Sequence, residues 1–306
     1  MTDLQGPSAT DGELALSPAA REDIVRRKIT CPFLGPAVRE GRLPVRNEAP
    51  RPLAGIEDLI ELGNAGGGDL GELLGFFAQG NHGFMPGGSG RLDRPVPAGL
   101  FSLDLPGSQG SHPGHSGILQ GDPNETGSGG FDEAAFQRLI APAREGLLKR
   151  SDVGKFIAAN LRRDPDSKVF GLKVAGLLAV DLARFVGQTG PALLETMSNA
   201  VGPDESAEGR RLYAHLTRLL GEDNLVGSAG EYGLLFAFFE NQPGARTRDG
   251  EPALDVDDLT AMFRDMAFPT GWDGWPKRRI GWVVNTTALM ISAGQAYLFD
   301  EPQAGG

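Results

Sequence analysis

The sequence predicts an all-α fold, a single compact helical domain with long loops rich in glycine and proline. From Phe131 onward apolar residues recur at helical spacing, and no sustained alternation of apolar and polar residues indicates a strand. Residues 63–130 are instead dense in glycine and proline, and a loop region of that length is usually functional or disordered. With 306 residues, 40% of them hydrophobic, the chain can bury a large core.

The order of the expected elements follows from composition and from helix start signals. Residues 1–20 are small, polar and acidic, so we expect a flexible N-terminal tail followed by a helical domain over residues 21–306. Ser151 and Asp255 are predicted N-caps, because acidic residues follow each of them in the first helical turn. Helices are expected at residues 55–63, 131–148, 151–163, 168–187, 191–202, 207–221, 228–241, 255–266 and 282–299.

Charge and composition exclude several classes of function. The net charge is −11, from 40 acidic and 29 basic residues, so no nucleic acid partner is expected. The N-terminus has no charged start followed by an apolar run, which predicts a cytoplasmic protein, or a secreted one if the natural N-terminus is missing. Polar residues interrupt the apolar segment 282–299, so we expect a buried helix there rather than a membrane span.

Cys31 is the only cysteine, and it lies in the turn-rich stretch TCPFLGPAVREGRLP. One cysteine excludes an intramolecular disulfide and any metal site made of cysteines alone. It leaves an inert buried thiol, a nucleophile, an intermolecular disulfide or a single-thiolate metal ligand. Since proline favours the first helical position, Cys31 and Pro32 predict a sulfur at the N-cap of a short helical turn, with Pro36 limiting its length. The free N–H groups there are expected to favour the thiolate.

Glu231 is the second candidate, because it lies on the apolar face of a predicted helix. Leu234, Leu235 and Phe238 follow it by three, four and seven residues. A carboxyl group in apolar surroundings is expected to have a raised pKa, which suits proton transfer near neutral pH. The alternative is a boundary residue that caps another helix.

The histidines and glycines are weaker indications of a functional site. Three of the four histidines, His82, His112 and His115, fall in the glycine-rich region, and the pair His112 and His115 could chelate a metal only with further ligands. The sequence has no phosphate-binding Walker loop, no H-E-x-x-H and no G-x-S-x-G. The glycines at 66–68 follow a helix rather than a strand, so a dinucleotide-binding loop is unsupported.

Taken in order over residues 28–280, these motifs resemble those of the haem-thiolate peroxidases, the family of chloroperoxidase and unspecific peroxygenase (peroxidase family 2). The Cys-Pro opening of that family is similar to CPFLGPAVREGRLP, and the helix and glycine-bearing stretch after it are similar to GIEDLIELGNAGGGDLGELLGFF. The family's histidine motif and next helix resemble FSLDLPGSQGSHPGHSGIL and FDEAAF. Its late motifs resemble SAGEYGLLFAFF and MFRDMAFPTGW.

The resemblance implies a haem b cofactor whose iron is held by Cys31, with Pro32 and Phe101 beside the cofactor. A thiolate ligand pushes electron density onto the iron and favours cleavage of the O–O bond. Glu231 would be the distal acid–base, taking a proton from peroxide and returning it to the leaving oxygen. His115, or His112 in the other register, would orient and tune that glutamate.

Two features depart from the family pattern. Val38, Arg39 and Glu40 stand where the family has asparagine, histidine and glycine. The acidic residue that binds a divalent cation beside a haem propionate is missing in both histidine registers.

The expected function is a peroxidase or peroxygenase that uses hydrogen peroxide to oxidise or oxygenate a small apolar or aromatic substrate. One alternative is a helical small-molecule-binding or scaffold protein of the same fold that has lost peroxide activation. A further one is a cysteine-dependent hydrolase that uses Cys31 and a histidine.

Overall fold

The structure is a computed structural model that describes residues 16–29, 31–48, 51–75, 100–103, 119–120, 130–163, 225–244 and 246–300. Helices predominate in these residues, but short strands form three small antiparallel sheets as well. The predicted all-α fold class is therefore wrong, and the described fold mixes helices with sheets. The strands are two to five residues long, too short for an alternating pattern to be visible in the sequence.

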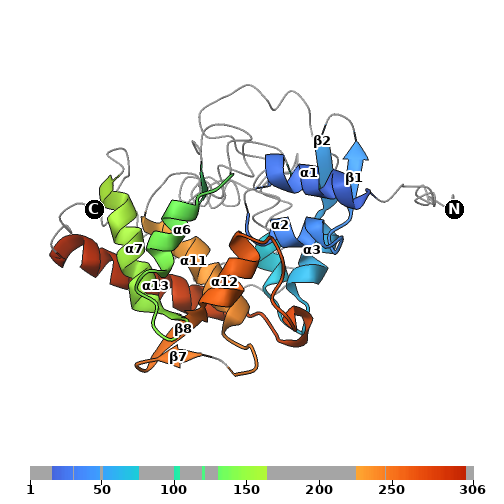
Figure 1. Cartoon of the computed structure of the whole chain (residues 1–306). Helices are drawn as coiled ribbons and strands as arrows, with labels where there is room; N and C mark the ends of the chain where they lie inside the picture. The colour runs from blue at the N-terminus through green and yellow to red at the C-terminus, as the bar shows by residue number, and fades with distance from the viewer. Residues whose placement is uncertain are drawn as a thin grey trace, which may run out of the picture.

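The described elements are arranged in chain order in Figure 1. The helices are α1 (Pro18–Lys28), α2 (Leu34–Arg39), α3 (Ile56–Gly63), α6 (Glu133–Ile140), α7 (Arg150–Arg163), α11 (Leu225–Phe239), α12 (Val256–Phe263) and α13 (Arg279–Phe299). The strands are β1 (Val45–Glu48), β2 (Arg51–Gly55), β3 (Leu100–Ser102), β4 (Leu119–Gln120), β5 (Gly130–Phe131), β6 (Leu147–Lys149), β7 (Thr247–Arg248) and β8 (Glu251–Asp255). A short 3₁₀ helix, η3, covers Trp272–Gly274.

The sheets join segments that are far apart in the chain. The first sheet has the order β1-β2-β3, and its register pairs Ala54 with Phe101. The second pairs β4 with β5, and the third has the order β6-β8-β7. In the third sheet, Leu148 pairs with Leu254, so the segment before α7 is bound to the segment before α12.

Most predicted helices in the described residues are present, with shifted ends. Helix α1 begins inside the predicted tail, because the Ser17 hydroxyl accepts a hydrogen bond from the N–H of Ala20 at 3.2 Å. The helix expected over 131–148 ends at Ile140, and its last residues form β6 instead. The predicted helices at 168–187, 191–202 and 207–221 lie outside the described residues.

The two predicted caps have different outcomes. Asp255 does cap α12, since its carboxylate accepts a hydrogen bond from the N–H of Asp257 at 2.7 Å. Ser151 is not an N-cap, because α7 already begins at Arg150. Asp152 binds the chain there instead, accepting a hydrogen bond from the N–H of Lys149 at 3.3 Å.

Helix α11 lies at the centre of the C-terminal half, where it packs against α13 and α7 (Figure 1). The aromatic residues of α11 belong to a buried cluster that also contains residues of the N-terminal segment. Phe33 stacks on Phe238 with ring centroids 5.2 Å apart, and Phe268 stacks on Trp272 at 4.7 Å. Aromatic contacts thus join residues from both ends of the chain in one core.

Lys277 lies inside this aromatic core rather than on the surface. Its ammonium lies 4.4 Å from the centroid of the Trp272 ring and 5.3 Å from that of Trp275, and it donates a hydrogen bond to the Trp272 carbonyl. Burial lowers the pKa of Lys277 to about 8. The two indole rings and the carbonyl compensate in part for removing this cation from water.

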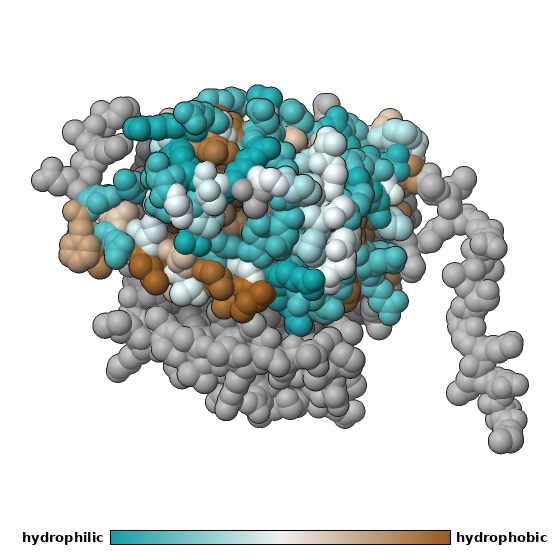
Figure 2. Space-filling model, turned by 90° about the horizontal axis from the view of Figure 1, so that it is seen from below, coloured by the Kyte–Doolittle hydropathy of each residue, from teal (hydrophilic) through white to brown (hydrophobic). Residues whose placement is uncertain are grey.

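Helix α13 buries one face and exposes the other. Trp282 and Leu289 belong to the core, whereas the exposed large apolar side chains of the described residues all lie on α13: Ile280, Val284, Ile291, Leu298 and Phe299. In the described part of the underside, hydrophilic side chains predominate and hydrophobic ones gather along one border (Figure 2). Within the described part of the chain, no helix is both long and apolar enough to cross a membrane.

The ion pair between Arg248 and Asp152 should be a main support of the third sheet. The two groups lie 2.5 Å apart and are largely buried, and Arg248 also donates to the Leu147 carbonyl at 2.5 Å. Replacing Arg248 with methionine leaves a buried carboxylate unpaired, so we expect urea denaturation to show a loss of about 3 kcal/mol in the free energy of unfolding.

The matched control is Arg264→Met, which removes an exposed ion pair with Asp265. That change should cost less than about 1 kcal/mol. An equal loss in the two variants would contradict the role given to Arg248.

Candidate functional site

Cys31 lies in the turn that leads into α2. Its carbonyl accepts a hydrogen bond from the N–H of Gly35 at 3.0 Å, and the N–H groups of Phe33 and Leu34 donate hydrogen bonds to its sulfur. The sulfur therefore accepts from the turn before α2, but the prediction that Cys31 is the N-cap is wrong, because α2 begins at Leu34 and its N-cap is Phe33. Pro36 does not end the turn, because α2 continues through it to Arg39.

The expected preference for the thiolate is wrong for the free sulfur. Cys31 is buried, and burial raises the pKa of its thiol to about 11, although the N–H groups of Phe33 and Leu34 act in the opposite direction. The backbone donors are apparent in the sequence pattern, but the depth of burial is not. At neutral pH the free thiol keeps its proton, which disfavours a cysteine-dependent hydrolase, whose nucleophile is the thiolate.

Glu231 lies on α11, half-buried, next to the same core. Leu234, Leu235 and Phe238 are buried, so the predicted apolar face is confirmed. Glu231 and Phe238 are seven residues apart, hence on one face of the helix and about 10 Å apart along its axis. Because Phe238 stacks on Phe33, this face of α11 is turned toward the Cys31 turn.

Electrostatics supports the same arrangement. Burial raises the pKa values of Cys31 and Tyr232, and the charge of Glu231 raises both of them further. Its effect on Cys31 is smaller than the effects of burial and of the Phe33 and Leu34 N–H groups, so Glu231 lies within electrostatic range of the thiol. The fold thus brings together the two residues that the sequence singles out, although they come from opposite halves of the chain.

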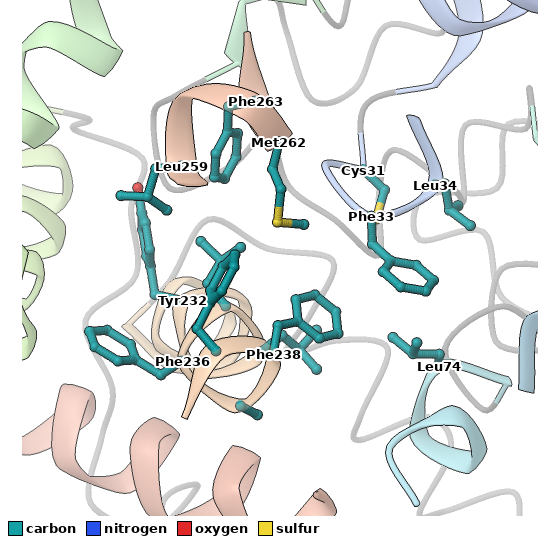
Figure 3. Close-up of a cluster of buried hydrophobic side chains, with 14 of the residues drawn as sticks. Cys31, Phe33, Leu34, Leu74, Tyr232, Phe236, Phe238, Leu259, Met262 and Phe263 are labelled. Atoms are coloured by element: carbon teal, nitrogen blue, oxygen red, sulfur yellow. The ribbon is translucent and has the colours of Figure 1, made fainter. Parts of the chain in front are cut away.

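The side chains around Cys31 are apolar and come from four segments (Figure 3). Phe33 and Leu34 lie at the start of α2, Leu74 in residues 71–75, Tyr232, Phe236 and Phe238 on α11, and Leu259, Met262 and Phe263 on α12. In Figure 3 the Met262 side chain extends from α12 toward the aromatic side chains of α11. We call the side chains labelled in this view the Cys31 cluster.

Sequence reasoning missed Met262 and Tyr232 as members of the core that contains Cys31. Leu259, Met262 and Phe263 have the spacing of one helical face, which could have marked them as core residues. Nothing in that spacing says which part of the chain the face contacts.

The other predicted site residues have different outcomes. Pro32 lies in the turn after Cys31, and Phe101 lies on β3, fully buried in the core that contains Cys31. His115 and His112 lie outside the described residues, so their pairing with Glu231 stays a prediction.

The residues that depart from the family motif hold the Cys31 turn in place. Val38 is fully buried in the core. Arg39 pairs with Glu22 on α1 at 3.0 Å and donates to the Asp265 carbonyl, and the Glu40 carboxylate accepts from the N–H of Phe268 at 2.7 Å. These contacts fasten α2 to α1 and to the segment after α12.

Removing the charge of Glu231 should lower the pKa of Cys31. In protein free of metal, Glu231→Gln abolishes a negative charge that raises that pKa, so the titration midpoint should move down from about 11. The Cβ chemical shift of isotope-labelled cysteine, followed against pH, reports this midpoint directly.

Glu240→Gln is the control, because it neutralises another partly buried carboxyl at the end of the same helix. The pKa of Glu240 is itself raised by burial, and its partner is Asn285 rather than Cys31. An unmoved Cys31 midpoint in Glu231→Gln, or an equal shift in both variants, would show that Glu231 is not the charge near Cys31.

No protein-family model matches the chain, and no curated protein or solved structure is detectably similar to it. The chemistry of the site is therefore inferred from its own residues. These are a buried thiol that accepts two backbone hydrogen bonds, a nearby carboxylate and an apolar, aromatic lining.

Proposed function

We propose that this protein is a haem-thiolate oxidoreductase, in which Cys31 holds the haem iron and Glu231 transfers protons to and from hydrogen peroxide. The observation that carries the proposal is the meeting of the Cys31 turn and the Glu231 face of α11 at one buried apolar cluster. An iron ligand and a proton-transfer group must both reach the same cofactor, and Phe33 and Phe238 bring the two segments that carry them into ring contact.

The donor chemistry of the Cys31 turn supports a haem group. In the described residues no further ligands gather into a metal-binding group, so a thiolate there would hold iron only with ligands that a cofactor such as a porphyrin supplies. Binding to a metal replaces the thiol proton, and the N–H groups of Phe33 and Leu34 already donate to the sulfur and stabilise its negative charge. The aromatic rings of Phe33 and Phe238 and the thioether of Met262 offer the apolar contacts that a macrocycle requires.

Once bound, a thiolate-ligated haem supplies the cleavage of the peroxide O–O bond. The part of Glu231 is to move one proton between the two oxygens of peroxide, accepting it from the first and donating it to the second. In residues 228–239 every residue except Glu231 is buried. Its half-buried position lets the carboxylate exchange protons with water while the rest of the helix keeps water out.

The lining of the cluster favours a small apolar or aromatic substrate. Phe236 and Phe238 and the neighbouring Leu259 are buried and carry no charge. A charged substrate would lose its hydration there without gaining a partner from these side chains. A binding protein without peroxide activation would share this lining, so turnover separates the two functions.

Haem loading is the first test. We expect the protein supplied with haem to show a Soret band and, when reduced under carbon monoxide, a maximum shifted far to the red, as thiolate ligation requires. Cys31→Ala removes the only thiol, so it should lose haem or that red shift. Protein that stays colourless with haem, or a Cys31→Ala variant with an unaltered spectrum, would overturn the proposal.

Peroxide turnover tests Glu231. Glu231→Gln keeps the size of the side chain but cannot move a proton, so peroxide-dependent oxidation should fall by about 10²–10⁴-fold with the Soret band intact. Glu240→Gln, on the residue that follows α11, should retain its turnover. Full activity in Glu231→Gln would mean that another group transfers the proton.

A further inference from the structure

A concave site lies between α6, α7 and the C-terminal end of α13. The cleft has a volume of about 1050 Å³, at the upper end of what small-molecule sites occupy, roughly 300–1000 Å³. Its lining residues are Arg138, Ala141, Pro142, Asp152, Lys155, Phe156, Ala158, Ala159, Asn160, Arg162, Ala296, Phe299 and Asp300. None of them belongs to the Cys31 cluster.

Small and aromatic side chains make up much of the wall. Ala158, Ala159 and Ala296 leave room for a ligand, and Phe156 is almost fully buried. Phe299 is 79% exposed, the highest exposure of any large apolar side chain in the described residues. An exposed phenyl ring at the edge of a cleft offers an apolar surface that a ligand could cover.

The charge of the cleft is opposite to that of the chain. Arg138 and Lys155 are exposed, and in the described part of the chain neither makes an ion pair. Asp152 faces the cleft but is neutralised by Arg248, 2.5 Å away. Among the described lining residues, the charges of Arg138, Lys155 and Arg162 therefore outnumber that of Asp300, in a protein whose net charge is −11.

The wall is also preformed. The Arg162 guanidinium donates to the carbonyls of Ala296, Tyr297 and Asp300 at 2.6, 2.7 and 2.7 Å, and it lies 5.4 Å from the centroid of the Tyr297 ring. These bonds join the end of α7 to the end of α13. A rigid wall spares a ligand part of the entropy cost of ordering its site.

We propose that this cleft binds an anionic amphiphile, a carboxylate with an apolar chain of the fatty-acid class. Its carboxylate pairs with Arg138 and Lys155, and its chain lies along the alanine-lined wall against Phe299. The site is separate from the haem proposal. The Phe156 ring, which contacts Tyr232 edge to face at 6.3 Å, stands between this cleft and the Cys31 cluster.

Calorimetric titration with laurate, below its micelle concentration, tests the proposal. Wild-type protein should bind laurate at least about tenfold more tightly than dodecanol, because only laurate can pair with the two cations; tenfold corresponds to about 1.4 kcal/mol. The double variant R138E/K155E should lose laurate binding by at least that factor. Ala159→Trp, which fills the cleft and keeps both cations, should weaken both ligands.

Arg278→Glu is the control, since it reverses an exposed charge outside the cleft and should leave laurate binding unchanged. Three results would overturn the proposal: no laurate binding by the wild type, equal binding of dodecanol, or unchanged binding in R138E/K155E. None of these measurements uses haem or peroxide, so failure here and failure of the proposed function are distinguishable.

Discussion

The burial of α11 is the constraint on which the rest of the structure depends. From Ala229 to Phe239 only Glu231 is not fully buried, so the helix must be covered on nearly all faces. Helices α7 and α13 pack against α11, and the aromatic ring of Phe33, from the N-terminal segment, stacks on its Phe238. The same packing that hides this helix from water determines where its one carboxylate lies.

The Cys31 turn is positioned by contacts on both of its sides. Phe33 contacts Phe238, Phe268 and Trp272, which anchors the turn in the aromatic core. Arg39 and Glu40, at the end of α2, bind α1 and the segment around Phe268. A thiol held in this way keeps a fixed direction, and a fixed direction is what a metal ligand needs.

The sequence predicted the elements whose signals are local. Helices α3 and α12 have clear apolar periodicity, α13 is a long apolar segment, and the Asp255 cap follows from its own neighbours. The short strands have no such signal, since pairs such as Ala54 with Phe101 depend on residues far apart in the chain. For the same reason the sequence could nominate Cys31 and Glu231 but could not show that they lie near each other. The predicted preference of Cys31 for the thiolate was also wrong. Hydrogen-bond donors can be inferred from a turn in the sequence, whereas the burial that raises the pKa of the thiol depends on the whole fold.

X-ray absorption at the iron edge of the haem-loaded protein is the most direct measurement of the central claim, that Cys31 is the iron ligand. We expect one sulfur neighbour of iron in the wild type and none in Cys31→Ser, because the structure offers a single thiol at the site. Only nitrogen and oxygen neighbours in the wild type would contradict the claim. A sulfur neighbour that persists in Cys31→Ser would contradict it as well, and would point to the thioether of Met262 instead.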